Sequence, residues 1–343
     1  MPSSARLGYQ ARKPDGTTVS IVTVNPAPQT IAFTPPATGA AGGSATLAAT
    51  GGGSGRPVTF TVDSTSGAGV CSVSGTNGST VTYNAAGNCV IDTNQAGSQD
   101  YLPAPQVTGT ITVTKAAPSL TTTAGGTVVV AGPPLTDTAT LAGGASPTGT
   151  ITFTLTNPGN TVVYTDHVTV TGNKTYSTAA GDHPGGYTPS TVGTYQWAVS
   201  YSGDSNNTGA TATTETQAAV YGFGGFTAPL PKSTLQKSGS TIPVKFTLTN
   251  AAGQPISATV AAALAAAGHV QATLAGPNIT TVTAVCTWST TALLFQCNIK
   301  TPTGLMTGPG YQITAQENVT GTFMNVPVVS TSTTPNPETV YFK

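Results

Sequence analysis

A period-2 alternation of large apolar residues with small or polar ones runs from residue 193 to residue 201. Its large members are Tyr195, Trp197, Val199 and Tyr201. This pattern predicts a half-buried β-strand, because successive side chains of a strand point to opposite faces. Aromatic side chains on one face can fill the space between two packed sheets. We therefore expect Tyr195, Trp197 and Tyr201 to be core aromatics.

Shorter alternations of the same kind recur along the chain, and turn residues separate them every 8–12 residues or so. They include segments around Phe60, Phe153 and Phe246. The spacing predicts an all-β protein made of three tandem β-sandwich domains, at roughly 100 residues each. The predicted domains are 29–117, 118–220 and 221–343. The Ala-rich stretch 260–268 predicts one short helix in the third domain.

The first two predicted domains resemble each other as divergent repeats. The matching positions are Gly87 with Gly193, Cys89 with Tyr195, Ile91 with Trp197, and Gly97 with Gly203. An aromatic residue therefore stands in the second repeat where the first has a cysteine.

Residues 1–28 do not fit a domain of their own. The segment 22–28 resembles 113–118, which closes one domain and leads into the next. Residues 1–28 are therefore read as an orphan strand, or the remnant of an upstream repeat, followed by a linker. The candidate interaction strand carries Thr18, Ser20, Val22 and Val24. Such a strand could add to the sheet of a neighbouring chain; the alternative is a disordered N-terminal segment.

Four cysteines fall as two pairs, Cys71 with Cys89 and Cys286 with Cys297, each inside one predicted domain. Even, intradomain pairing predicts disulfides and an oxidising compartment. A turn at 291–292 would place Cys286 opposite Cys297, on the face that carries Trp288, which we expect in the core. The alternative is four reduced, buried cysteines.

Composition excludes some functions. Charged residues make up 6% of the 343 residues, against a usual ~25%. Lys and Arg (11) balance Asp and Glu (11), so no basic field attracts nucleic acid. There is no apolar run of about 18 residues to predict membrane insertion. The first ten residues lack the apolar centre of a secretory signal, so for an exported protein we expect the signal and anchor outside this chain.

Candidate metal ligands are few. The chain has three histidines, His167, His183 and His269. None has a cysteine, histidine or carboxylate at a typical metal-ligand spacing, and solvated loop histidines are expected. The turn 204–207 offers oxygens that suit Ca²⁺, and Asp166 and Asp182 could join it. Asp and Asn side chains also stabilise such turns unaided. The sequence predicts no metal and no cofactor.

Catalytic motifs are lacking from the sequence. It has no G-x-S-x-G nucleophile elbow and no phosphate loop. Its three glutamates, Glu215, Glu317 and Glu338, are far apart in sequence. We predict that the protein is not an enzyme.

Two further groups allow a structural and a functional interpretation. Lys245 with Glu317 and Asn318 could form an isopeptide bond, but Lys245 alternates with apolar neighbours and is expected to face solvent. The apolar residues of 221–230 either form the first strand of the third domain or an exposed patch. The Thr row at 150, 152 and 154 could bind glycan, although Thr is also the usual solvent-facing strand residue.

Several segments resemble the bacterial Ig-like repeats of large surface proteins. They include QTIAFTPP, GNCVIDTNQAGSQDYLPAP, GTITFTLTNPGNTVVYTD and GTYQWAVSYSGDSNN. The third domain resembles a C-terminal surface-protein module, with FGGFTAPLPKSTLQKSGSTIPVKFTL as its motif. The resemblance covers about residues 22–343 and implies Ig-like folds in extracellular spacers, stalks or adhesive surfaces.

The predicted function is therefore that of an extracellular surface-protein segment, a structural stalk or adhesive module without catalysis. Two alternatives stay open: the subunit of a filament assembled by strand donation, and a glycan-binding appendage of a secreted enzyme. Expected partners are copies of the chain, neighbouring repeats, or a glycan or other surface ligand.

Overall fold

The structure is a computed structural model that describes residues 25–230, 235–308, 310–319, 321–329, 332 and 334–342. Within these residues it consists of β-strands, one α-helix and two 3-10 turns. The predicted all-β class with a short helix is confirmed. The candidate interaction strand with Thr18, Ser20, Val22 and Val24 lies outside the described residues. No helix in the described ranges is long and apolar enough to cross a membrane.

Contacts between residues divide the chain into two compact units. Among the described residues, the first unit combines 25–118 with the loops 143–148 and 203–209, and the second takes in 119–142, 149–202 and the described residues from 210 to 342. Buried apolar side chains gather in three clusters, one in the first unit and two in the second. We call the parts around these clusters the first, second and third sandwich. The domain boundaries at 118 and 220 stay predictions, because the last two sandwiches share one compact unit.

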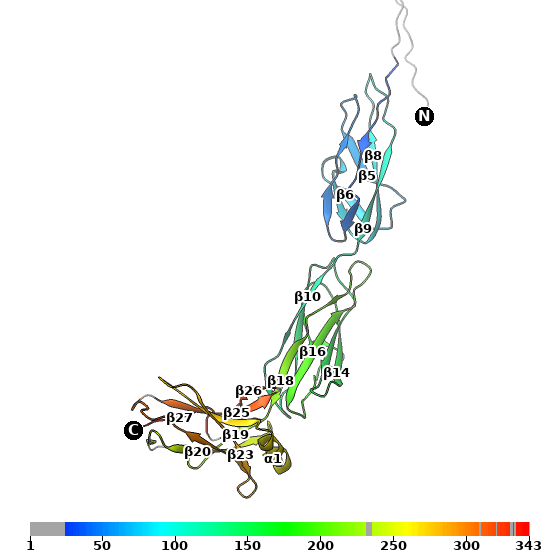
Figure 1. Cartoon of the computed structure of the whole chain (residues 1–343). Helices are drawn as coiled ribbons and strands as arrows, with labels where there is room; N and C mark the ends of the chain where they lie inside the picture. Colours follow the sequence, from blue (N-terminus) through cyan, green and yellow to red (C-terminus); the bar gives the residue numbers. More distant parts are fainter. Residues whose placement is uncertain are drawn as a thin grey trace, which may run out of the picture. The chain divides into compact units, whose positions relative to one another are not determined.

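The first sandwich packs a sheet of order β2-β9-β8-β5 against a sheet of order β3-β7-β6, with a small pair β1-β4 (Figure 1). Phe60, Ile91 and Ile111 from one sheet meet Val81 and Tyr83 from the other. The turn at 76–79 joins β6 to β7. The elements are β1 (Ala32–Phe33), β2 (Thr38–Ala40), β3 (Ser44–Thr46), β4 (Ala49–Thr50), β5 (Val58–Val62), β6 (Cys71–Ser74), η1 (Thr76–Gly78), β7 (Thr80–Tyr83), β8 (Gly87–Gln95) and β9 (Val107–Thr114).

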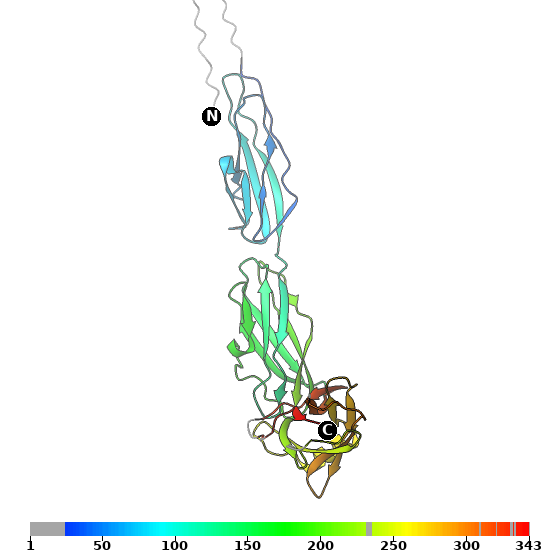
Figure 2. The same ribbon diagram turned by 90° about the vertical axis from the view of Figure 1, so that its left-hand side faces the viewer.

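The second sandwich packs a three-stranded sheet, β10-β12-β15, against a six-stranded sheet, β11-β18-β16-β13-β14, with β17 on β16. Its long strands run nearly along one direction (Figure 2). Tyr195 and Trp197 are fully buried, and Tyr201 is 2% exposed. The elements are β10 (Ser119–Ala124), β11 (Val128–Val129), β12 (Asp137–Ala142), β13 (Thr150–Thr156), β14 (Val162–Thr169), β15 (Thr175–Ser177), η2 (Thr178–Ala180), β16 (Gly193–Tyr201), β17 (Ala210–Thr211) and β18 (Glu215–Val220).

The third sandwich packs a sheet β19-β20-β24-β23 against a sheet β22-β21-β25-β26, with β27 on β25. Residues 223–230 belong to its core rather than to an exposed patch, since Phe223, Phe226 and Leu230 are buried. The elements are β19 (Gly222–Thr227), β20 (Thr241–Thr249), α1 (Ala258–Ala266), β21 (Val270–Ala275), β22 (Val282–Val285), β23 (Thr287–Ser289), β24 (Leu294–Lys300), β25 (Tyr311–Val319), β26 (Thr322–Asn325) and β27 (Glu338–Val340).

Local signals set the ends of helix α1. The Ser257 side chain accepts a hydrogen bond from the Val260 N–H at the first turn, which satisfies one of the unpaired donors there. Gly268 follows the helix with φ +70°, a conformation that glycine adopts without strain.

Both cysteine pairs form disulfides. The bond between Cys71 and Cys89 joins the two sheets of the first sandwich, with a Cα–Cα distance of 5.7 Å. The bond between Cys286 and Cys297 spans 4.2 Å between Cα atoms. Cys286 lies between β22 and β23, which pair in different sheets. The second disulfide therefore lies where the chain crosses from one sheet to the other, and residues 282–288 are not the single strand that their alternation predicts.

The two sandwiches of the second unit are joined without a linker, because β18 ends at Val220 and β19 begins at Gly222. The intervening Tyr221 N–H donates to Glu317 Oε2 at 2.9 Å. The Val130 N–H donates to the Val220 carbonyl at 3.0 Å, and the Ala251 N–H donates to the Val130 carbonyl at 3.1 Å. These bonds come from both sandwiches and hold the junction.

Corresponding strands of the first and second sandwiches pair in the same register. Val62 lies opposite Ile91 in the first, and Leu155 lies opposite Trp197 in the second. Further along, Phe60 faces Thr93 as Phe153 faces Val199. The matched glycines also agree, since φ is +144° at Gly87 and +146° at Gly193.

Candidate metal centre

Strand β14 brings a carboxylate into the second sandwich. It is an edge strand that pairs only with β13. Its last residues alternate, so that Asp166 and Val168 are buried while His167 and Thr169 are exposed. Asp166 thus occupies a position at which an apolar side chain is the usual occupant, and no part of its side chain is exposed.

A loop returns over this edge after the 3-10 turn η2. A Cβ atom on Gly181 would overlap the Asp166 carboxylate, so glycine permits the close approach of the loop backbone. The next residue, Asp182, donates its N–H to the His167 carbonyl at 3.2 Å and accepts the His167 N–H at 2.8 Å through Oδ1. The loop therefore covers backbone groups that an edge strand leaves unpaired.

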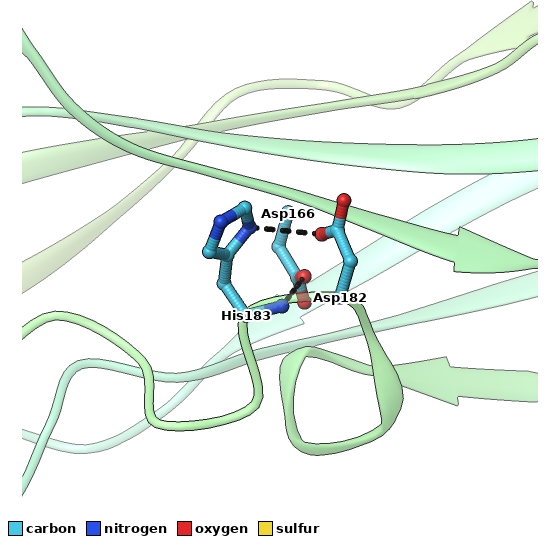
Figure 3. Close-up of side chains that lie close together, drawn as sticks. All are labelled: Asp166, Asp182 and His183. Carbon is cyan, nitrogen blue, oxygen red and sulfur yellow. Dashed lines mark hydrogen bonds and ion pairs between the residues drawn. The ribbon is translucent and has the colours of Figure 1, made fainter.

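His183 contacts both aspartates, Asp182 through its ring and Asp166 through its backbone N–H (Figure 3). His167 Nδ1 lies 3.0 Å from Asp182 Oδ2, and His183 Nδ1 lies 2.9 Å from Asp182 Oδ1. The His183 N–H donates to Asp166 Oδ1 at 2.8 Å. Asp166 Oδ2 is buried without a hydrogen-bond partner. Atoms of Asp166, Asp182 and His183 that can bind a metal lie within 4.8 Å of one another, the single such group in the described ranges.

The electrostatics of the loop follow from these contacts. The His167 N–H, followed by the neighbouring Asp166 carboxyl group, holds the pKa of Asp182 below its usual range. Burial raises the pKa of Tyr164 above its ordinary value, and the charge of Asp166 adds to this effect. Tyr164 therefore stays protonated, and its hydroxyl group donates a hydrogen bond to the His183 carbonyl at 2.7 Å. This bond connects the loop to strand β14.

This group is not predicted by the sequence. No histidine has a typical metal-ligand spacing there, and Asp166 and Asp182 were considered only as additions to the turn at Asp204. The fold brings Asp166 and Asp182 to each other instead. The signal in the sequence is a polar residue, Asp166, at an inward position of an alternating strand, but His183, whose N–H binds it, lies 17 residues further along.

The turn at 204–207, whose oxygens could suit Ca²⁺, has hydrogen bonds that account for its polar side chains. Asp204 Oδ1 accepts the N–H groups of Asn206 and Asn207 at 2.7 and 2.9 Å, and Oδ2 accepts the Thr148 N–H at 2.6 Å. Such bonds are typical of a turn stabilised by Asp and Asn.

The remaining candidates lie apart from this group. Trp288 is only half-buried and packs edge-on against Phe295 at 5.1 Å, so it lines the core rather than filling it. Lys245 lies on β20 and Asn318 on β25, in different sheets. The Asn318 side chain accepts the Gly321 N–H at 2.7 Å. His269 is exposed.

Comparison with known proteins identifies no family. No family model matches the chain, and no curated protein matches it. Among solved structures it is similar to the fibronectin(III)-like modules of CbhA from Clostridium thermocellum, with 17% identity, a TM-score of 0.21, and coverage of 55% of this chain and 92% of that one.

Two other solved structures are similar at the same level. The adhesin InvE of Yersinia pseudotuberculosis has 15% identity, a TM-score of 0.26, and coverage of 64% of this chain and 66% of that one. The Bacteroides ovatus protein SGBP-B, solved with a mixed-linkage heptasaccharide, has 13% identity, a TM-score of 0.19, and coverage of 89% and 66%. All three scores lie far below 0.5, so these likenesses say nothing of what the chain binds.

Proposed function

We propose that this chain is a segment of an extracellular bacterial surface protein and acts as a stalk or spacer without catalysis. The junction within the second unit carries the proposal. One residue, Tyr221, separates β18 from β19, and Glu317 binds its N–H. A spacer has to hold its domains in a fixed orientation. A connection of one residue that receives hydrogen bonds from both sandwiches does so.

The disulfides support the extracellular part of the proposal. All four cysteines are bonded, in pairs 18 and 11 residues apart. Structural disulfides of this kind persist in oxidising compartments such as the cell surface. They also stabilise small sandwiches whose cores are limited in size.

Spin labels across the junction test the spacer. Val162 on the second sandwich and Leu293 on the third are 56% and 57% exposed, so labels introduced there as unnatural amino acids leave both disulfides and cores intact. Pulsed electron spin resonance should give one narrow distance distribution. A broad distribution would show a hinged tether and would overturn the spacer proposal.

The alternatives are weaker on the described residues. Glycan binding commonly uses stacked aromatic platforms, and Tyr341 is the one strongly exposed aromatic side chain in the described part of the chain. Strand donation by residues 1–24 stays a prediction, because those residues lie outside the described structure. Size-exclusion chromatography of the full chain and of a variant without residues 1–24 checks it: a monomer unchanged by the deletion excludes the filament.

A further inference from the structure

The second sandwich contains a buried carboxylate that the protein alone leaves uncompensated. Asp166 is fully buried. Its Oδ1 accepts one hydrogen bond, from the His183 N–H, and its Oδ2 has no partner. An ionised carboxylate out of water requires hydrogen bonds or an opposite charge at its oxygens. Half of this carboxylate has neither.

The group that faces Asp166 makes the imbalance larger. Asp182, itself acidic and exposed, lies beside Asp166, since atoms of the two carboxylates that can bind a metal lie within 4.8 Å of each other. Among the described residues the ion pairs of Asp182 are with His167 and His183, and no lysine or arginine pairs with Asp166. Two carboxylates this close need a positive species between them, either a proton or a cation.

The donor set favours a transition-metal cation over a proton or Ca²⁺. The cluster offers two carboxylate oxygens and an imidazole nitrogen. Imidazole suits Zn²⁺ and its neighbours, whereas Ca²⁺ takes six to eight oxygens. Three protein ligands with a water in the fourth position is a common zinc arrangement.

We propose that Asp166, Asp182 and His183 bind one Zn²⁺ ion, with His167 as the residue that positions Asp182. Donor atoms around tetrahedral zinc lie about 3.3 Å apart, from Zn–ligand bonds of 2.0–2.1 Å. The donors here lie within 4.8 Å, so the site closes by small rotations of the exposed Asp182 and His183. The buried Asp166 is the fixed ligand on which they close.

The ion would fasten the loop to the edge of the sheet. Asp166 belongs to β14, whereas Asp182 and His183 belong to the loop after η2. Without an ion, one bond between backbones, from the Asp182 N–H to the His167 carbonyl, connects the two segments near this point. Side chains add the contacts of His167 with the Asp182 carboxylate, the bond from the His183 N–H to Asp166 and the Tyr164 hydroxyl bond. A shared ion would cross-link them and cover the exposed edge more firmly.

Calorimetric titration of the full, chelator-treated chain with ZnCl₂, and separately with CaCl₂, tests the proposal. The chain has no free cysteine to compete for zinc. Asp166→Asn and His183→Gln remove ligands, and His183 is a safe position because 65% of its side chain is exposed. His269→Gln is the matched control, since His269 is an exposed histidine outside the cluster.

We expect one Zn²⁺ per chain in the unmodified protein and in His269→Gln. Affinity should fall at least about a hundredfold in Asp166→Asn and His183→Gln, and about ten- to hundredfold in His167→Gln, as for residues that orient ligands. Zinc should also raise the melting temperature of the unmodified chain and not that of His183→Gln.

Three results would overturn the proposal. One is the lack of saturable zinc binding at millimolar ion, which leaves a shared proton between the two carboxylates. Another is an equal loss of affinity in His269→Gln and His183→Gln, which means unspecific histidine binding. The third is binding of Ca²⁺ in place of Zn²⁺.

Discussion

The first and second sandwiches share a register but are reinforced by different means. At the matched position, Cys89 in the first forms a disulfide with Cys71 on the opposite sheet, and Tyr195 in the second is a buried aromatic that hydrogen-bonds to Thr191. One position along the same face, Ile91 corresponds to Trp197. The Trp197 Nε1–H donates to Gln217 Oε1 at 3.0 Å.

The comparison separates what the fold needs from what stabilises it. Alternation along the strands and a positive-φ glycine at the start of the central strand occur in both sandwiches. A covalent bond joins the two sheets of the first sandwich, whereas the second has buried aromatic side chains and their hydrogen bonds at the matched positions. The same topology therefore tolerates either solution, and each should fail under a different perturbation.

The largest effect is expected for Trp197→Ala. Removing this fully buried side chain should cost about 3–5 kcal/mol of unfolding free energy, because it leaves a cavity beside Phe153 and removes the Trp197 donor from the Gln217 Oε1 atom. Hydrogen exchange read by mass spectrometry should show faster exchange in the second sandwich and unchanged exchange in the first. Tyr341→Ala, an exposed aromatic, is the control and should change stability by less than about 0.5 kcal/mol. An equal increase in hydrogen exchange in both sandwiches would contradict the view that their cores are independent.

The first sandwich should instead depend on its disulfide. Replacing Cys71 and Cys89 together with Ala should cost about 3 kcal/mol, from the loop of 18 residues that the bond closes. Denaturant titration with local exchange as the readout measures the loss. A reductant should destabilise the unmodified first sandwich by a similar amount and leave the second unchanged. A drop in the second sandwich would show that the two are coupled.

The junction of the second unit adds a pH dependence that the first unit is not predicted to share. Burial raises the pKa of Glu317 to about 7, and the hydrogen bond from Tyr221 opposes this only in part. The pKa of Glu317 is thus higher in the folded than in the unfolded state. The unfolding free energy is therefore highest at low pH and falls as the pH rises through the folded-state pKa. The decrease in unfolding free energy should reach up to about 3 kcal/mol.

Thermal unfolding of the second unit from pH 4 to pH 8 measures this loss. Glu317→Gln keeps an acceptor for the Tyr221 N–H and carries no charge. The variant should therefore be the more stable protein above pH 7 and should lose most of the pH slope. An unchanged slope would mean that Glu317 is not the group that titrates.

The smallest effect is expected for the matched glycines, and it should be the same in both sandwiches. Gly87→Ala and Gly193→Ala each force a side chain to φ near +145°, at about 1–3 kcal/mol. Each new Cβ also meets a neighbour, Val70 for Gly87 and Pro158 for Gly193. Melting temperatures of the two variants give the comparison. A large drop in melting temperature for one variant and none for the other would show that the two repeats do not both depend on a positive-φ glycine at this position.

Features repeated locally along the chain were predictable from the sequence. Alternation around Trp197 and Phe246 predicts strands and core faces, since the period of a strand is local. The helix was also expected at 260–268 and occurs at Ala258–Ala266. The crossing of the chain between sheets at Cys286 was missed, because alternation does not tell which sheet a strand joins.

The polar sites were less predictable, because they depend on contacts between distant segments. Glu317 is buried by meeting Tyr221, 96 residues away. Asp166 meets a loop whose path over the sheet edge depends on Gly181. Neither contact leaves a periodic trace in the sequence.

Pulling the full chain by its two ends in a force spectrometer, with and without reductant, tests most directly whether the sandwiches resist load as separately reinforced modules. Without reductant, the disulfides of the first and third sandwiches should keep the loops that they close from extending. These loops are 18 and 11 residues long, so the unfolding steps should be shorter by about 60 and 35 Å of extended chain. With reductant those lengths should appear in two unfolding steps, while the step of the second sandwich stays the same. Step lengths that do not respond to reductant, or a second sandwich that does, would contradict the comparison between a covalent and an aromatic reinforcement.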